Sequence, residues 1–96
     1  MLVEYHPSVR RDVAEAMRRY KGVSDKLARD FKAELCHVIA MARDNPSRFH
    51  PVKPGLHRAN LKRFPYHFIY REIPEGIRVI LLRHHRQHPD SGMERQ

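Results

Sequence analysis

The sequence has little cysteine, few acidic residues and no long apolar run. Its single cysteine, Cys36, excludes an internal disulfide and favours a reducing compartment, and we expect it to be a small core residue of a helix. No apolar run approaches the roughly 20 residues that a membrane-spanning helix needs. The first residues also lack the apolar core of a signal peptide. We therefore expect a cytoplasmic protein without a membrane partner.

The shortage of acidic residues leaves a strongly basic chain. Lys and Arg together number 19 against 11 for Asp and Glu, which gives a net charge of +8 with His neutral. Most of these cations are Arg, the residue best suited to bidentate contacts with phosphate or carboxylate. Such a charge favours RNA, DNA or an acidic protein as partner, and a basic surface that serves only solubility is the alternative. The 96 residues form one domain, residues 1–96, with a polar tail over about 90–96.

The first half of the chain is predicted to contain one strand and two helices. Residues 2–6 form a short strand, and apolar residues then recur at helical spacing over residues 7–21 and 24–43. Gly22 suits a left-handed C-cap of the first helix, and Ser24 suits the N-cap of the second. Two amphipathic helices joined by so short a link form an αα-hairpin.

The second half of the chain is predicted to be mostly strand. Residues 46–56, with three prolines and a glycine, are interpreted as a loop. Residues 57–64 then alternate between polar and apolar side chains. This alternation predicts a half-exposed strand with Arg58, Asn60 and Lys62 on one face.

Two apolar runs near the C-terminus have the pattern of a β-hairpin. They span residues 68–73 and 77–82, and a short turn of Pro, Glu and Gly joins them. The second run is apolar on both faces, which predicts a central strand with Ile77, Val79 and Leu81 on one side. It ends in four cationic or titratable residues at 83–86. Such an ending predicts a sheet edge that faces a polyanion.

The order strand, helix, helix, strand, strand, strand predicts an α+β two-layer sandwich. The N-terminal strand joins a three-stranded antiparallel meander to give a four-stranded sheet, because it has no other partner. The αα-hairpin covers one face of this sheet. The other face is left to solvent or partners.

Several motifs of the chain, taken together, resemble the RelE/ParE superfamily of bacterial type II toxins. The resemblance runs over nearly the whole length. It is carried by His6-Pro7, Leu27-Ala28-x-x-Phe31, Asn45-Pro46, Gly55-Leu56-x-Arg58, Arg63-Phe64-Pro65-Tyr66-x-x-x-Tyr70-Arg71 and His84-x-Arg86-x-x-Pro89. The resemblance implies a small toxin that arrests growth and is neutralised by a cognate antitoxin. RelE-like members cut mRNA on the ribosome, whereas ParE-like members poison DNA gyrase and are not nucleases.

The resemblance places only part of a RelE-like nuclease site on this chain. The strand lysines of those enzymes correspond to Arg58 and Asn60, the arginine after the Tyr to His67, and the arginine after the last strand to Arg86. The C-terminal Tyr of the family falls near Gly92, so that group is lost. Metal-free RNA cleavage needs a base, an acid and cations for the developing phosphorane charge.

In a second, YoeB-like nuclease branch, the general acid stands at the position that corresponds to His85. A His has a pKa near ~6.5 and exchanges protons near neutral pH. The candidate catalytic residues are therefore His85, Arg86 and His67, whereas His84 is interpreted as a scaffold residue that makes a hydrogen bond at a strand end. The candidate phosphate- or RNA-binding residues are cations of the last three strands: Arg58, Lys62, Arg63 and Arg83. We expect Arg58, Lys62, His67, His85 and Arg86 to share one concave basic face.

Three functions stay open at the level of sequence. The protein is a metal-free endoribonuclease that needs the ribosome and mRNA, a non-catalytic inhibitor of DNA gyrase, or a degenerate non-toxic binding module. No cofactor and no metal ion are expected in any of the three. The ParE-like tail pattern keeps its His, Arg and Pro here but lacks its Trp.

Overall fold

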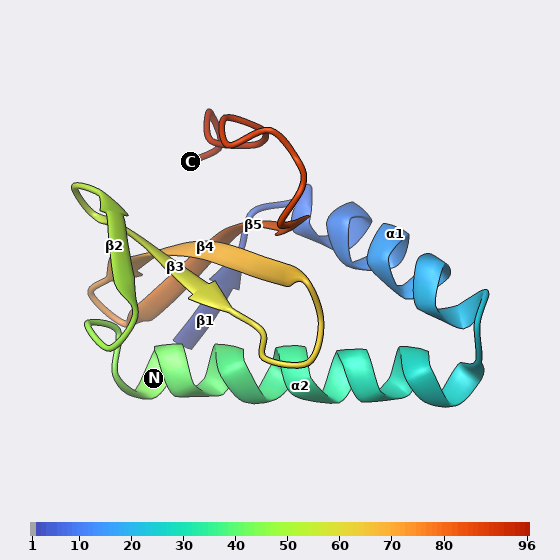
Figure 1. Ribbon diagram of the computed structural model, residues 1–96. Coiled ribbons are helices and arrows are strands. Elements are labelled where there is room, and N and C mark those ends of the chain that lie inside the picture. The colour runs from blue at the N-terminus through green and yellow to red at the C-terminus, as the bar shows by residue number, and fades with distance from the viewer. Residues whose placement is uncertain (1) are drawn as a thin grey trace.

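The computed structural model describes residues 2–96 as two helices and one five-stranded sheet (Figure 1). In chain order the elements are β1 (Leu2–Tyr5), α1 (Val9–Lys21), α2 (Asp25–Asp44), β2 (His50–Lys53), β3 (Leu56–Asn60), β4 (Tyr66–Ile73) and β5 (Gly76–His84). Apolar side chains of both helices pack on one face of the sheet and form the main core with it. The predicted α+β two-layer fold, with its N-terminal strand, αα-hairpin and antiparallel meander, is confirmed.

The sheet has the strand order β1-β5-β4-β3-β2. β3, β4 and β5 form the predicted meander, and β1 pairs with β5 in parallel, so β5 is an interior strand as expected. The backbones of β1 and β5 approach closely at Gly76. A Cβ atom there would overlap the carbonyl oxygen of Leu2, so only glycine fits this position.

A fifth strand, β2, lies where a loop was predicted. It pairs antiparallel with β3 at the sheet edge, with an irregular register between Pro51 and Lys53. Proline is tolerated there because an edge strand does not need every N–H for the ladder. The turn into β3 contains Gly55 at a φ of 80°, a conformation that favours glycine. The proline-rich composition therefore concealed an edge strand.

The strand predicted over residues 57–64 ends early, at Asn60. Leu61 and Phe64 are buried in the main core, and the backbone N–H groups of Lys62 and Arg63 donate to the carboxylate of Glu34 on α2. The chain therefore leaves the sheet and crosses to α2 instead of continuing the alternation.

A β-bulge at Ile80 changes which side chains of β5 share a face. Ile69 pairs with Leu81 whereas Tyr70 pairs with Val79, so Ile80 has no partner on β4. Ile80 and Leu81 then belong to a second apolar cluster on the open face of the sheet, away from the main core. The prediction that Leu81 lies on the same side as Ile77 and Val79 was wrong, because an extra residue inverts the alternation.

The helical hairpin follows the sequence closely. The predicted spans differ from the observed ones by at most two residues at any end, and the Ser24 side chain accepts a hydrogen bond from the Leu27 N–H, as a cap does. Gly22 is right-handed, with φ −62°, so the predicted left-handed cap was wrong. Cys36 is exposed and not part of the core, because it lies one position past the buried stripe residue Leu35.

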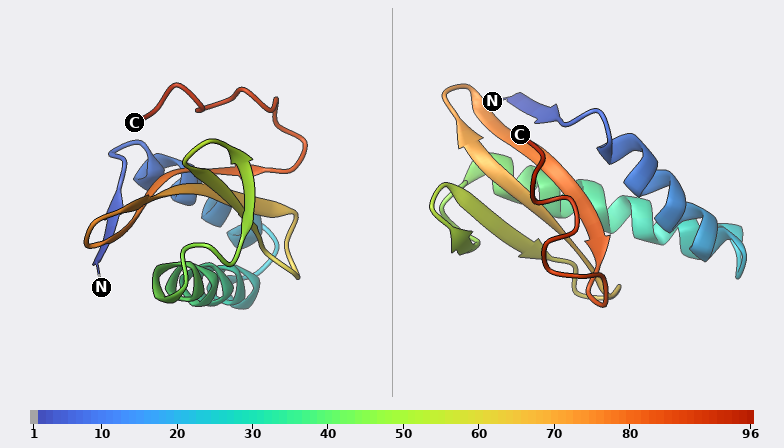
Figure 2. Two further views of the ribbon diagram at one scale, coloured as in Figure 1. Left: turned by 90° about the vertical axis from the view of Figure 1, so that its left-hand side faces the viewer. Right: turned by 90° about the horizontal axis from the view of Figure 1, so that it is seen from above.

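The C-terminal segment, residues 88–96, crosses the side of the sheet opposite α2 (Figure 2). Met93 packs on the open-face apolar cluster, and Arg71 and Arg78 donate to the backbone oxygen of Gln96. Arg95 forms an ion pair with Asp12 of α1 and also donates to the carbonyl oxygen of Ile80. The segment predicted as a polar tail is therefore docked on the fold.

Candidate anion-binding site

A cluster of cationic and imidazole side chains lies on the open face, near the end of β5. Cross-strand pairing brings the cluster together, because Asn60 of β3 lies opposite His67 of β4, and His67 lies opposite Arg83 of β5. Arg58 lies two residues before Asn60 and therefore on the same face. His85 follows β5, and its backbone N–H donates to the Pro65 carbonyl.

The bulge in β5 decides that Arg83 belongs to this cluster. Without the extra residue at Ile80, the alternation of β5 would turn Arg83 toward the helices, on the side of Val79. With it, Arg83 is only 7% exposed and lies beside His67, which is 1% exposed. Arg83 also donates to the carbonyl oxygens of Pro89 and Ser91, so the C-terminal segment helps to hold its guanidinium.

The two histidines and Arg83 form a chain of hydrogen bonds. The Arg83 Nε donates to His67 Nε2 at 2.8 Å, and His67 Nδ1 lies 2.9 Å from His85 Nδ1. The two imidazole rings are stacked, with centroids 5.1 Å apart and 15° between their planes. These contacts leave each ring one orientation.

The same contacts determine which nitrogens carry protons. A guanidinium only donates, so His67 Nε2 must be the acceptor, and neutral His67 carries its proton on Nδ1. His67 Nδ1–H then donates to His85 Nδ1, which leaves the His85 proton on Nε2. His85 is exposed, so its Nε2–H is directed to solvent. Protonation of His85 on Nδ1 would place two N–H groups against each other.

Both histidines are held in the neutral form. Burial, followed by the charges of Arg58 and Arg83, lowers the pKa of His67 from 6.5 to about 3. Burial and the charge of Arg58 also lower the pKa of His85. At neutral pH a chain of hydrogen bonds therefore runs from Arg83 through His67 to His85. Neither imidazole carries a second proton that it could transfer.

Arg58 is the cation that faces solvent in this cluster. Its Nε donates to the Asn60 side-chain oxygen at 2.8 Å, and one terminal nitrogen lies 3.4 Å from His85 Nδ1. Within residues 2–96, no carboxylate lies within ion-pair distance of Arg58 or Arg83. Asn60, which was predicted to share a strand face with Arg58 but had no role assigned, is a positioning residue for Arg58. The period of two along β3 was the signal for it.

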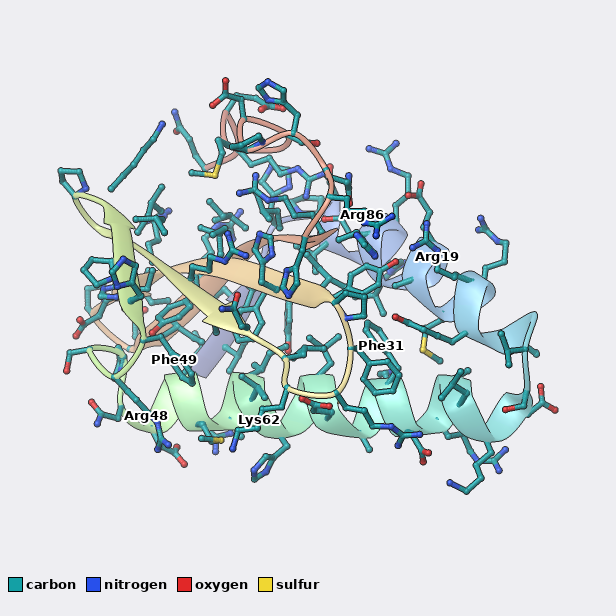
Figure 3. The ribbon with its side chains drawn as sticks, viewed as in Figure 1. Arg19, Phe31, Arg48, Phe49, Lys62 and Arg86 are labelled. Atoms are coloured by element: carbon teal, nitrogen blue, oxygen red, sulfur yellow. The ribbon has the colours of Figure 1, made fainter. Side chains whose placement is uncertain are left out.

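Two of the predicted phosphate-binding residues lie elsewhere. Arg63 forms an ion pair with Asp30 of α2 at 2.9 Å, and Lys62 lies beside α2 (Figure 3). The predicted shared face therefore lacks Lys62, because β3 ends at Asn60 and the chain crosses to the helix. Arg86 is also separate from the cluster, since it lines a notch with Arg19 of α1 and with His84. His84 makes the predicted hydrogen bond at the strand end, where its Nδ1 accepts from the Arg86 N–H.

Metal ligation finds no support in the part of the chain that the structure describes. No group of three or more His, Cys, Asp or Glu side chains in residues 2–96 is arranged to hold a metal ion. The cluster of Arg58 and His85 instead presents N–H donors beside positive charge. Such an arrangement is chemically complementary to an anionic group.

Comparisons with known proteins agree with this fold. The structure resembles one described as "Chromosomal ParDE TA system from P. aeruginosa", with a TM-score of 0.75 and 12% sequence identity over 88% of this chain and 95% of that chain. At this identity the likeness shows the fold alone. A search of curated proteins finds no match.

A family profile identifies the chain. The two-layer fold and the motifs of the sequence define a small domain of the RelE/ParE superfamily. Residues 3–89 match the family described as "ParE toxin of type II toxin-antitoxin system, parDE". The chain therefore belongs to the ParE toxin family, and a toxin of such a system has a cognate antitoxin as partner. None of the helices in residues 2–96 combines the length and the apolar character needed to span a bilayer.

Proposed function

We propose that this protein arrests growth as a non-catalytic toxin that inhibits DNA gyrase. The observation that carries the proposal is the hydrogen-bond chain from Arg83 through His67 to His85. It gives the open face a fixed array of donors without a group that transfers protons at neutral pH. Membership of the ParE family favours the same choice over mRNA cleavage.

The chemistry of RNA cleavage is poorly served by this arrangement. A general acid must carry an extra proton at the working pH, yet burial and Arg58 lower the pKa of His85. A general base needs an accessible lone pair, yet His85 Nδ1 accepts from His67 and its Nε2 carries the proton. Gly92 stands near the position of the family's C-terminal Tyr. The catalytic roles considered for His85, His67 and Arg86 are therefore not part of the proposal.

The open face has the chemistry of a binding surface for an anionic group of the target. Arg58 supplies a permanent charge, and the exposed His85 supplies the Nε2–H beside it. Asn60 and His67 hold these two donors in place through hydrogen bonds. A preorganised pair of this kind binds with a smaller entropy cost for ordering its side chains.

A separate surface suits the antitoxin. A cavity of about 580 Å³ opens between β1, α1 and α2 and is lined mainly by apolar side chains, with Arg10 and Lys32 among its lining residues. An apolar segment with acidic flanks fits both features. The antitoxin therefore binds here in this proposal, away from the cluster of Arg58 and His85.

The test is direct inhibition of gyrase by the purified toxin. We expect loss of DNA supercoiling and accumulation of cleaved DNA, while mRNA in a translation extract stays intact. Arg58→Gln should weaken inhibition, and Arg29→Gln, an exposed arginine of α2, is the matched control. Ribosome-dependent mRNA cleavage that is lost in His85→Ala would replace this proposal with the nuclease function.

A further inference from the structure

A second basic site lies where the end of α1 meets the end of β5. It is a notch of about 520 Å³ lined by Arg19, Pro65, His84, Arg86 and Gln87. Figure 3 shows the side chains of Arg19 and Arg86 close together on this side of the molecule. The notch is distinct from the cluster of Arg58 and His85. His84 lines the notch, whereas the next residue, His85, stacks on His67 in the cluster.

Two hydrogen bonds and one ring contact hold His84 where it lines the notch. Its Nδ1 accepts the Arg86 backbone N–H at 3.0 Å, so the proton of the neutral ring is on Nε2. The Gln87 side-chain oxygen accepts the His84 backbone N–H at 2.8 Å, and the Tyr66 ring meets the His84 ring edge-on. Burial and the charges of Arg19 and Arg86 lower the pKa of His84, which also places both arginines near its ring.

The balance of charge in the notch is positive. Its lining contains two arginines and no carboxylate. Two acids line an adjoining groove, Asp12 and Glu15. Asp12 is already paired with Arg95 and accepts the Leu82 N–H, so its charge is largely compensated. Glu15 is exposed, where solvent and salt screen it.

We propose that the notch of Arg19, His84 and Arg86 binds a phosphate group of a nucleic-acid backbone. Two guanidinium groups on separate elements can donate to the two non-bridging oxygens that share the single charge of a phosphodiester, and the His84 Nε2–H provides a third donor. The phosphodiester oxygens are arranged tetrahedrally, which suits donors that approach from different elements better than the planar oxygens of a carboxylate do. The net charge of +8 attracts the same ligand over longer range. This site is separate from the one proposed for gyrase, and neither depends on the other.

The test follows the His84 ring by NMR while a thymidine dinucleotide phosphodiester and then a single-stranded DNA 12-mer are added. A bound phosphate stabilises the imidazolium, so the His84 resonance should shift and its pKa should rise. Arg19→Gln and Arg86→Gln should each weaken DNA binding by roughly tenfold. Each should also lower the slope of log affinity against log salt by roughly one.

Controls separate this site from general attraction of DNA to a basic protein. Arg29→Gln removes the same charge from α2 and should leave the His84 response unchanged. Arg19 and Arg86 are exposed, so both variants should keep the wild-type melting temperature. The titration of the wild-type protein tests the site even if a variant fails to fold. An unresponsive His84, an equal loss in Arg29→Gln, or tighter binding of an acidic peptide to the notch would each overturn the proposal. A failure of gyrase inhibition alone would leave it intact.

Discussion

The two faces of the sheet use the same strands for different kinds of contact. On the helix face, aromatic rings of α1, α2 and the sheet side meet edge to face. Most of the buried side chains belong to the core on this face. The open face has a small cluster of Ile69, Ile80 and Leu81 beside the polar network of His67 and Arg83. Apolar burial therefore holds the fold mainly from one side, while hydrogen bonds position the candidate site on the other.

The largest expected effect tests the helix face. Phe31→Ala removes a fully buried ring that meets Tyr20, Phe64 and Tyr66, and it should lower the free energy of unfolding by about 3–5 kcal/mol. Leu56→Ala on the open face should cost less than about 2 kcal/mol, because Leu56 is only partly buried. Urea unfolding measures both. Equal losses would show that the two faces contribute alike.

The next effect tests the neutral state of His67. Unfolded His67 takes up a proton near pH 6.5, whereas folded His67 does so only near pH 3. Its contribution is therefore complete above pH 6.5 and is lost as the pH falls toward 3. The slope should be at most about 1.4 kcal/mol per pH unit.

Urea unfolding between pH 7 and pH 4 measures this slope. His67→Gln should flatten the curve over that interval, because the substituted side chain does not titrate. His37→Gln, at an exposed position of α2, is the control and should keep the wild-type curve. An identical slope in wild type and His67→Gln would contradict a neutral, buried His67.

A smaller effect tests the segment that crosses the open face. Arg95→Ala removes the ion pair with Asp12 and the hydrogen bond to the Ile80 carbonyl, and it should cost about 1–3 kcal/mol. A double-mutant cycle with Asp12→Ala isolates the coupling between the two side chains. Glu94→Ala, at the exposed neighbouring position, should change stability by less than about 0.5 kcal/mol. Additive losses in the cycle would mean that the ion pair contributes nothing.

The smallest effect separates antitoxin binding from the open face. Arg10→Glu with Lys32→Glu should slow association with the antitoxin a few-fold and reduce its dependence on salt, because these charges line the apolar cavity. Arg58→Gln should leave the antitoxin association rate unchanged. Surface plasmon resonance at two salt concentrations measures the association rate of each variant with the antitoxin. Slower association in Arg58→Gln would place the antitoxin on the open face instead.

Much of the fold could be predicted from local pattern. The helices and the hairpin of β4 and β5 follow from periodicity and turn residues, which act over a few neighbours. The joining of β1 to the sheet followed from the absence of any other partner strand. β2 could not be predicted, because Pro51 is acceptable only at an edge that the assembled sheet defines. The docking of the C-terminal segment also depends on distant partners such as Asp12.

The candidate site was predicted in part. The period of two along β3 placed Arg58 correctly, and the residues at the end of β5 indicated a basic region. Lys62 and Arg63 were misplaced because the pattern was extended past Asn60, where the burial of Leu61 and Phe64 draws the chain toward α2. No local signal shows that the His67 ring lies between Arg83 and His85.

The sequence by itself determined the layers of this protein, its basic charge and its family, because periodicity, composition and short motifs are properties of neighbouring residues. Only the tertiary structure decided which cations act together. One extra residue at Ile80 turns Arg83 to the open face, and the hydrogen bonds made there set the tautomers of His67 and His85. The physical reason is that a bulge and a proton position both depend on the partner across the strand, and that partner is distant in the chain.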